Sequence, residues 1–437
     1  MDLDASAIDG LAARVLESGM APAVALAVTD RERTLLARTY GAASTDALWP
    51  LASIGKSFTA VVALQLVEEG LLDLHAPVTD YVPWLSVRTP GGPVTVHHLL
   101  THTAGLVQSS DVAPASNYDV VALAGTETGY APGEHRHYSN IGYRAVGVVL
   151  EAVTGRPYPE LLQRRVLDRL GLEASSPVMA GEMRRRLPGG HVPFYDDRSW
   201  RPEHGLAPGP WVESAEADGC VCCSVEDLAA WLRALWAGGD LLSGESLAAM
   251  KTSQAPHDGD GYGYGLDVHD DGFGHDGDML GYVSYMRADT ASGLGVVAFA
   301  NGFGGAWWLG EAVLAVSAGR EPPKLDPTPD APLVDDGSCP PEWQGFAGRF
   351  RAHNPWLPAF LVAAREGRLV LGTDWTDGSE RHALTPLGDG SFRVGEPDWT
   401  PERLLFDTAV DGRAQRAVLS GTPYYRTFTG SHAASTM

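Results

Sequence analysis

A serine and a lysine three positions apart are the first residues in this sequence whose types and spacing could do chemistry together. Ser53 and Lys56 lie where an apolar segment with helical spacing begins, and residues at i and i+3 of a helix share one face. Lysine is rare here: of 32 basic residues, only those at 56, 251 and 324 are lysine. Arginine keeps its proton in proteins, whereas a buried lysine can release it, so Lys56 is a candidate base for Ser53.

Two other short motifs contain residues suited to proton transfer and substrate binding. Tyr138 and Asn140 precede a segment with helical spacing, and His275 and Gly277 precede an apolar, strand-like segment at 282–286. A phenol next to an ammonium group can act as a base, and an amide can hold a substrate carbonyl. Gly277 would let a backbone N–H approach the reacting carbonyl. Each motif alone is usually structural, so the interpretation depends on their combination.

In this order and with these separations, the three motifs resemble those of the serine β-lactamase and penicillin-binding-protein superfamily, in its class C and esterase-like branch. That pattern is Ser-x-x-Lys, then Tyr-x-Asn, then Lys-Thr-Gly or His-x-Gly. The stretches at 97–106 (HHLLTHTAGL) and 138–155 also look familial, and the likeness covers about residues 10–320. The resemblance implies a serine hydrolase on a β-lactamase/transpeptidase-like fold.

The resemblance also implies roles for single residues, carried over by position. Ser53 would be the nucleophile that forms the acyl-enzyme, while Lys56 and Tyr138 would move its proton to the leaving group and from the attacking water. Asn140 would bind the acyl-side carbonyl of the substrate. The oxyanion hole would come from the backbone N–H groups of Ser53 and of Asp278, which follows His-x-Gly. Whether the lysine or the tyrosine is the base stays open.

The third motif departs from that of dedicated β-lactamases and carboxypeptidases, in which a lysine helps to bind a substrate carboxylate. His275, a further catalytic candidate, occupies that position, and Asp276 stands where a threonine is usual. Both changes disfavour an anionic, penicillin-like substrate. We therefore expect a hydrolase of esters, amides or peptides, including peptides with D-amino acids. Three alternatives stay open: a β-lactamase or D-alanyl-D-alanine carboxypeptidase, an acyl transferase or peptide-cyclising thioesterase, and a penicillin-recognising sensor that is acylated without turnover.

The expected secondary structure indicates an α/β (α+β) fold, in which helices flank an antiparallel sheet. Hairpins are expected at 22–41 and 280–301, with strands from both ends of the domain joining one sheet. A helix buried on one face should begin near Ser53. Further helices are expected near 141–154, 158–170, 225–237 and 305–318.

A proline-rich segment at 321–341 divides the chain into a hydrolase domain, 1–320, and a C-terminal domain, 342–437. Short alternating runs between Gly and Asp turns predict that the C-terminal domain is a small all-β sandwich or barrel, and it resembles the lipocalin-like barrels of some family members. In such relatives the extra domain can border the active-site cleft. The simpler expectation is that the domain stabilises the protein without direct contact with the substrate. Arg426 is the candidate substrate-binding residue in this domain.

Composition narrows the possible partners. A formal net charge of −23 disfavours nucleic acids and anionic membrane surfaces, so the expected partner is a small-molecule or peptide substrate. No apolar run approaches the roughly 18 residues that span a bilayer, and the acidic N-terminus predicts a cytoplasmic location without export.

We expect no cofactor and no metal, because no HExxH spacing occurs among the histidines at 97, 98, 102, 135 and 137. Cys220, Cys222 and Cys223 should be buried small residues.

Overall fold

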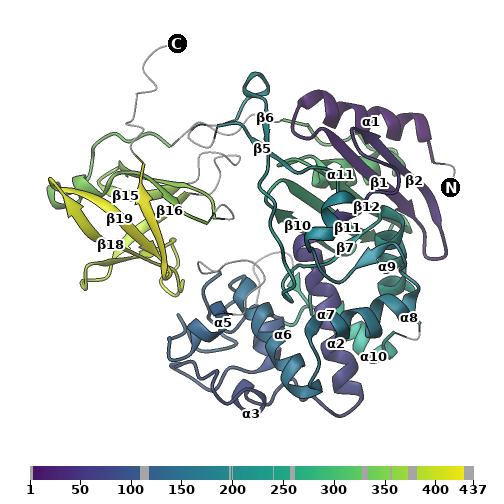
Figure 1. Cartoon of the computed structure of the whole chain (residues 1–437), viewed down its shortest axis with the longest axis horizontal. Helices are drawn as coiled ribbons and strands as arrows, with labels where there is room; N and C mark the ends of the chain where they lie inside the picture. Colours follow the sequence, from purple (N-terminus) through teal and green to yellow (C-terminus); the bar gives the residue numbers. More distant parts are fainter. Residues whose placement is uncertain are drawn as a thin grey trace.

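The computed structural model describes residues 3–108, 118–195, 198, 200–239, 241–255, 261–326, 333–354, 357–372 and 381–427. A sheet flanked by helices lies on one side of the molecule, and a barrel formed by the C-terminal part of the chain lies on the other (Figure 1). Within the predicted linker, residues 321–326 and 333–340 form neither helix nor strand. The predicted fold class, with its second all-β domain, is confirmed.

The central sheet is antiparallel, with seven strands in the order β2-β1-β12-β11-β10-β9-β8. The strands are β1 (Ala23–Thr29), β2 (Thr34–Gly41), β8 (Gly261–Tyr262), β9 (Asp267–His269), β10 (Gly272–Met279), β11 (Tyr282–Asp289) and β12 (Leu294–Ala300). The two predicted hairpins are β1–β2 and β11–β12, and they meet where β1 pairs with β12. Every residue of β1 and β12 is buried, because hydrophobic cores lie against both faces of the sheet.

The helices divide between the two faces of the sheet. On one face are α1 (Ala5–Ser18) and α11 (Ala306–Ser317), and on the other are α2 (Gly55–Glu68) and α9 (Val225–Ala237). The other helices are α3 (Val78–Tyr81), α4 (Val96–Leu100), α5 (Tyr118–Leu123), α6 (Asn140–Thr154), α7 (Tyr158–Leu162), a π-helical turn (Gln163–Leu167), α8 (Asp168–Leu170) and α10 (Gly244–Met250). Small sheets pair β3 (Trp49–Pro50) and β4 (Ser175–Ser176) with β7 (Cys222–Cys223), and β5 (His191–Pro193) with β6 (Leu206–Pro208).

The helix that follows Ser53 differs from the sequence prediction in its start and its burial. Ser53 lies in a 3₁₀ turn, Ala52–Ile54, and α2 begins two residues later, at Gly55. We expected one buried face, but residues 55–66 are all buried. The reason is that α6 and α7 pack against α2 within the largest hydrophobic core, so that no face of this part of the helix meets water.

The C-terminal domain is a closed antiparallel barrel. It follows a 3₁₀ turn, Pro341–Phe346, and its strands are β13 (Gly348–Ala352), β14 (Phe360–Arg365), β15 (Arg368–Gly372), β16 (Arg381–Pro386), β17 (Ser391–Val394), β18 (Arg403–Val410), β19 (Arg413–Leu419) and β20 (Thr422–Arg426). Phe350, Phe360 and Phe392 belong to the core that fills it. Closure leaves no strand edge unpaired, which is how a small sheet avoids association through its edges.

Two further features bear on the sequence predictions. In the described part of the chain, no helix is both long and apolar enough to cross a bilayer. Cys220, Cys222 and Cys223 are free and buried, as expected for small core residues, and burial raises the pKa of the Cys222 thiol to about 12.

Candidate active site

The structure brings Ser53 and Lys56 into direct contact at the start of α2. Ser53 is partly exposed, whereas the exposed fraction of Lys56 is 0%. The Nζ atom of Lys56 donates one hydrogen bond to Oγ of Ser53 at 2.9 Å and another to the backbone carbonyl of Asp218, also at 2.9 Å. The carbonyl of Asp218 therefore fixes the end of the lysine side chain, while Nζ faces the serine. A nucleophile and its base require such a contact.

Close backbone contacts hold the turn that carries Ser53. Ala52 has a φ of 46°, which residues other than glycine rarely adopt. Strand β10 crosses beside this turn: a Cβ atom at Gly277 would lie 2.2 Å from the carbonyl oxygen of Leu51, so only glycine permits the approach. The hydroxyl of Ser284 in β11 donates to the same carbonyl at 2.7 Å. The sheet thereby places the third motif next to Ser53.

Burial gives Lys56 an unusual proton affinity. Its pKa is lowered from 10.5 to about 7, chiefly by burial; the carboxylates of Asp218 and Asp276 oppose the shift and the guanidinium of Arg144 adds to it. A shift of this size corresponds to about 5 kcal/mol between the two protonation states. Near neutral pH a substantial fraction of Lys56 is therefore neutral and able to accept a proton.

Tyr138 has the opposite property. Burial raises its pKa well above 10.0, although a hydrogen bond with Ser53 acts in the other direction. The Nζ atom of Lys56 lies 4.9 Å from the centroid of the Tyr138 ring, so the tyrosine joins the Ser53–Lys56 pair. The two groups therefore differ: burial favours the protonated phenol of Tyr138, whereas part of Lys56 is neutral near neutral pH.

A buried histidine, His102, supports the segment that carries Tyr138. The two rings lie 4.2 Å apart between centroids, and Nδ1 of His102 accepts a hydrogen bond from the backbone N–H of Ser139 at 2.9 Å. An accepting Nδ1 carries no proton, in agreement with burial, which lowers the pKa of His102 well below 6.5. These contacts give His102 a structural position next to the segment that carries Tyr138.

Asn140 is the first residue of α6, directly after the N-cap residue Ser139. Its backbone N–H donates to the carbonyl of Gln108 at 2.8 Å. Its side-chain Oδ1 is buried and has no hydrogen-bond partner among the described residues. A buried amide oxygen without a partner is costly, and no internal hydrogen bond of Oδ1 would oppose the predicted use of Asn140 in substrate binding.

A buried ion network behind Lys56 was not predicted from the sequence. The guanidinium of Arg144 lies 2.7 Å from Asp119 and 3.1 Å from Asp218, and the carbonyl of Asp218 is the second acceptor of Lys56. The network thus fixes the position of that carbonyl. One signal was present in the sequence: Arg144 lies four residues after Asn140 on a predicted helix, so the two share a face.

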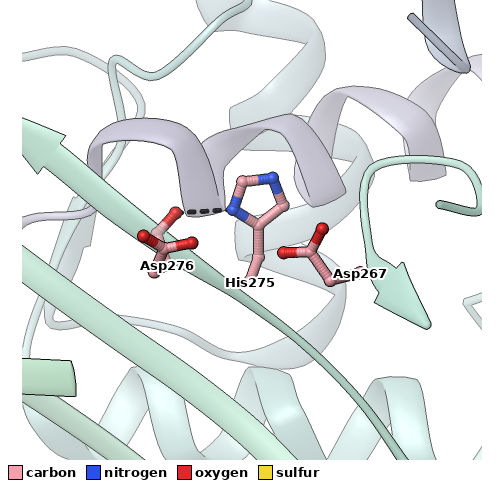
Figure 2. Close-up of side chains that lie close together, drawn as sticks. All are labelled: Asp267, His275 and Asp276. Atoms are coloured by element: carbon pink, nitrogen blue, oxygen red, sulfur yellow. Dashed lines mark hydrogen bonds between the residues drawn. The ribbon is translucent and has the colours of Figure 1, made fainter. Parts of the chain in front are cut away.

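The other side of the site, on β10, is polar and acidic (Figure 2). Nδ1 of His275 lies 2.5 Å from the carbonyl of Asp276, and Nε2 lies 3.3 Å from the hydroxyl of Tyr262. Nδ1 therefore donates to the Asp276 carbonyl, whereas Nε2 faces a hydroxyl that can either donate or accept. Asp276 and Asp278 are exposed, and Asp267 lies on the other side of His275. Asp276 and Asp278, which form the acidic wall of the site, flank Gly277, and Gly277 contacts the turn that carries Ser53.

Asp267, His275 and Asp276 each offer a potential metal ligand, and the three ligand atoms lie within 4.8 Å of one another. Both ring nitrogens of His275 face a hydrogen-bond partner, so a metal ion bound at Nε2 would have to displace the hydroxyl of Tyr262. The histidines singled out in the sequence also have structural contacts. For example, His97 contacts the hydroxyl of Tyr264 at 2.9 Å.

The structure does not bring Arg426 to the other candidates. Its guanidinium donates to three backbone carbonyls of the C-terminal domain, those of Ala414, Ala347 at 2.8 Å and Gly345 at 2.9 Å. It also lies 5.1 Å from the centroid of the Phe350 ring. Three of its five N–H donors are used inside its own domain, which gives Arg426 a structural position in the barrel and does not support the predicted substrate contact.

Comparison with known proteins agrees with this geometry. A family model described as Beta-lactamase matches residues 8–313, and the chain belongs to this family of serine hydrolases. Penicillin-binding protein 4 of Amycolatopsis lactamdurans is 27% identical over 284 residues, which are 60% of this chain and 74% of that protein. Esterase EstB of Burkholderia gladioli is 33% identical over 164 residues, which are 33% of this chain and 42% of the esterase.

Solved structures share the fold. A D-stereospecific amidohydrolase from Streptomyces sp. matches with a TM-score of 0.60 and 26% identity, covering 68% of this chain and 94% of that one. The octameric penicillin-binding protein homologue from Pyrococcus abyssi matches with a TM-score of 0.65 and 23% identity, covering 97% of this chain and 100% of that one. At this identity the second likeness shows the fold alone, and it extends over both domains. The predicted family and the barrel domain are thus confirmed.

Proposed function

We propose that this protein is a serine hydrolase that cleaves neutral esters or amides through an acyl-enzyme on Ser53. The observation that carries the proposal is the 2.9 Å hydrogen bond between Ser53 and Lys56, a lysine whose pKa is lowered by burial to about 7. A lysine with that pKa can take the serine proton near neutral pH, as general-base catalysis requires.

In the proposed reaction, Oγ of Ser53 attacks the substrate carbonyl while its proton passes to Lys56. The tetrahedral intermediate collapses, the bond to the alcohol or amine breaks, and Tyr138 relays a proton to that leaving group. Water then attacks the acyl-enzyme and gives its proton to the same pair of residues. The pair returns a proton to Oγ of Ser53 as the bond to the acyl group breaks and the acid leaves. The oxyanion would be held by backbone N–H groups of Ser53 and Asp278, each worth about 3 kcal/mol.

The substrate class follows from the acidic wall on β10. Asp276 and Asp278 are exposed there, and His275 replaces a permanent cation, so a substrate carboxylate would meet negative charge. A neutral ester, amide or peptide avoids this cost. Two proteins similar to this chain, an esterase and a D-stereospecific amidohydrolase, are named for such reactions, which supports the inclusion of peptides with D-amino acids. With a net charge of −23, small molecules and peptides are the proposed partners, rather than nucleic acids or membranes.

The test is a panel of chromogenic substrates: a neutral nitrophenyl ester, several D-aminoacyl anilides and a cephalosporin. Steady turnover of the neutral substrates, with kcat/KM at least 10-fold above that for the cephalosporin, is the expected result. The Ser53→Ala variant provides the background rate. One stoichiometric burst without turnover would support an acylated sensor instead, and a preference for the cephalosporin would support a β-lactamase.

A further inference from the structure

One loop of the C-terminal barrel lies on the hydrolase domain. This docking loop, residues 395–402, connects β17 to β18. The ring of Trp399 stacks on that of His135, with 4.5 Å between centroids and 9° between planes, and meets the edge of Tyr130 at 5.4 Å. A Cβ atom at Gly129 would lie 2.8 Å from the carbonyl oxygen of Trp399 and 2.9 Å from Cα of Pro401, so the two backbones approach as closely as glycine permits.

The last residue of the docking loop, Glu402, reaches the hydrolase domain with its carboxylate. Oε1 accepts a hydrogen bond from the backbone N–H of Gln108 at 2.8 Å and lies 2.9 Å from Nε2 of His137. The side chains of Glu402 and His137 are only 16% and 20% exposed, so the pair is largely shielded from water. A partly buried carboxylate with two partners in the other domain is a more specific contact than a surface ion pair.

Both partners of Glu402 adjoin the second catalytic motif. His137 directly precedes Tyr138, and its own N–H donates to the carbonyl of His102 at 2.8 Å. The carbonyl of Gln108 accepts the N–H of Asn140 at 2.8 Å, while the N–H of the same Gln108 donates to Glu402. The carboxylate from the barrel therefore restrains the chain next to Tyr138 and also Gln108, the residue whose carbonyl holds the start of α6.

We infer that Glu402 is a positioning residue of the hydrolase, and that the barrel completes the active site by fixing the segment that carries Tyr138 and Asn140. This inference rests on the proposed function. Ser53 and Lys56 are fixed within the hydrolase domain by α2 and the sheet. Tyr138 precedes α6 in a segment without helix or strand, so its placement depends on contacts such as this one. Small errors in the placement of a proton-transfer group cost large factors in rate.

The experiment compares the full-length Glu402→Ala and Glu402→Gln variants with a matched control, Glu396→Ala. Glu396 belongs to the same docking loop, but it is exposed and pairs with Arg368 of the barrel at 3.2 Å. Rates are measured with the neutral nitrophenyl ester and divided by the number of sites that a fluorophosphonate titrates. A merely structural role would lower the number of titrated sites but not kcat per site.

For Glu402→Ala we expect kcat per titrated site to fall about 10-fold or more, as found when catalytic groups lose their positioning. Glu402→Gln should fall less, because its amide oxygen can still accept the N–H of Gln108. Glu396→Ala should match the wild type. If Glu402→Ala has the per-site kcat and KM of Glu396→Ala, the inference is overturned. If the wild type shows no turnover that depends on Ser53, the proposed function fails instead.

A second measurement is independent of turnover. Amide hydrogen exchange over residues 129–141 should become faster in Glu402→Ala and stay unchanged in Glu396→Ala, because only the first variant releases the segment around Tyr138. Unchanged exchange in Glu402→Ala would overturn the positioning role whatever the enzyme's activity. Faster exchange together with a lower per-site kcat would support it.

Discussion

The two sides of the candidate active site differ in their contact with water. On the α2 side, Lys56 is fully buried and its pKa is lowered to about 7. On the β10 side, Asp276 and Asp278 are exposed beside a buried, hydrogen-bonded His275. In the proposed function, these two sides have different tasks, which need opposite environments. Removing water changes proton affinity, whereas selecting substrates by charge needs groups that an incoming molecule can reach.

The largest expected effect comes from removing the nucleophile on the buried side. Ser53→Ala should lower kcat for the neutral ester by about 10⁴-fold or more, since loss of a covalent nucleophile abolishes the acyl-enzyme route. Labelling by a fluorophosphonate should disappear, while the melting temperature should stay close to that of the wild type. Persistent labelling at another serine would show that the nucleophile has been misassigned.

Lys56 offers the next largest effect and a test of its proton affinity. Lys56→Arg should lose about 10³-fold in kcat, nearly as much as Lys56→Met, because arginine keeps the charge but cannot accept a proton. In the wild type, kcat/KM should rise as the pH increases through about 7, where Lys56 becomes neutral, and then level off. An active Lys56→Arg enzyme would show that charge alone suffices on this side of the site.

The same residue should affect stability with a defined sign. The pKa of Lys56 is about 7 in the folded state and near 10.5 when the chain is unfolded, so the unfolded state binds more protons between these values. The contribution of Lys56 to the free energy of unfolding therefore increases with pH over this range and is least favourable below pH 7. Lys56→Met should remove this dependence and stabilise the protein by up to about 5 kcal/mol below pH 7, less the lost hydrogen bonds. Denaturant unfolding across pH would measure it.

A smaller effect is expected from changing the exposed side. His275→Lys with Asp276→Thr introduces a cation and removes an anion where a substrate carboxylate would lie. The ratio of kcat/KM for the neutral ester to that for a cephalosporin should fall about 10-fold to 100-fold, as charge-assisted hydrogen bonds of about 1.5–3 kcal/mol allow. If the ratio does not move, charge selection does not occur on β10.

The smallest catalytic effect is expected in the barrel, at Arg426. Arg426→Met removes a guanidinium that donates to Ala347, Gly345 and Ala414 but keeps an apolar side chain over Phe350. The barrel should lose about 1–3 kcal/mol of stability, because three partly buried carbonyls lose their donor, while kcat/KM should stay within about twofold. A large loss of kcat/KM without loss of stability would restore Arg426 as a substrate-binding candidate.

Much of the fold and one part of the site could be predicted from local patterns. The hairpins at 22–41 and 280–301 appear as β1–β2 and β11–β12, and the helix expected at 225–237 appears at Val225–Ala237. The contact between Ser53 and Lys56 was predictable because only three positions separate the two residues across the 3₁₀ turn and the start of α2, where side chains at i and i+3 face the same way. The start of α2 and its burial on all sides were not predictable, since both depend on what packs around the helix.

The sequence by itself thus determined the residue types and local spacings of the three motifs, which follow from short-range backbone geometry. The tertiary structure decided which distant groups adjust them. Burial of Lys56 depends on α6 and α7, the second acceptor of its ammonium group comes from Asp218, and the restraint next to Tyr138 comes from Glu402 in another domain. The physical reason is that desolvation and charge interactions act through space, whatever the separation along the chain. No spacing in the sequence could show that Lys56 would lose its water.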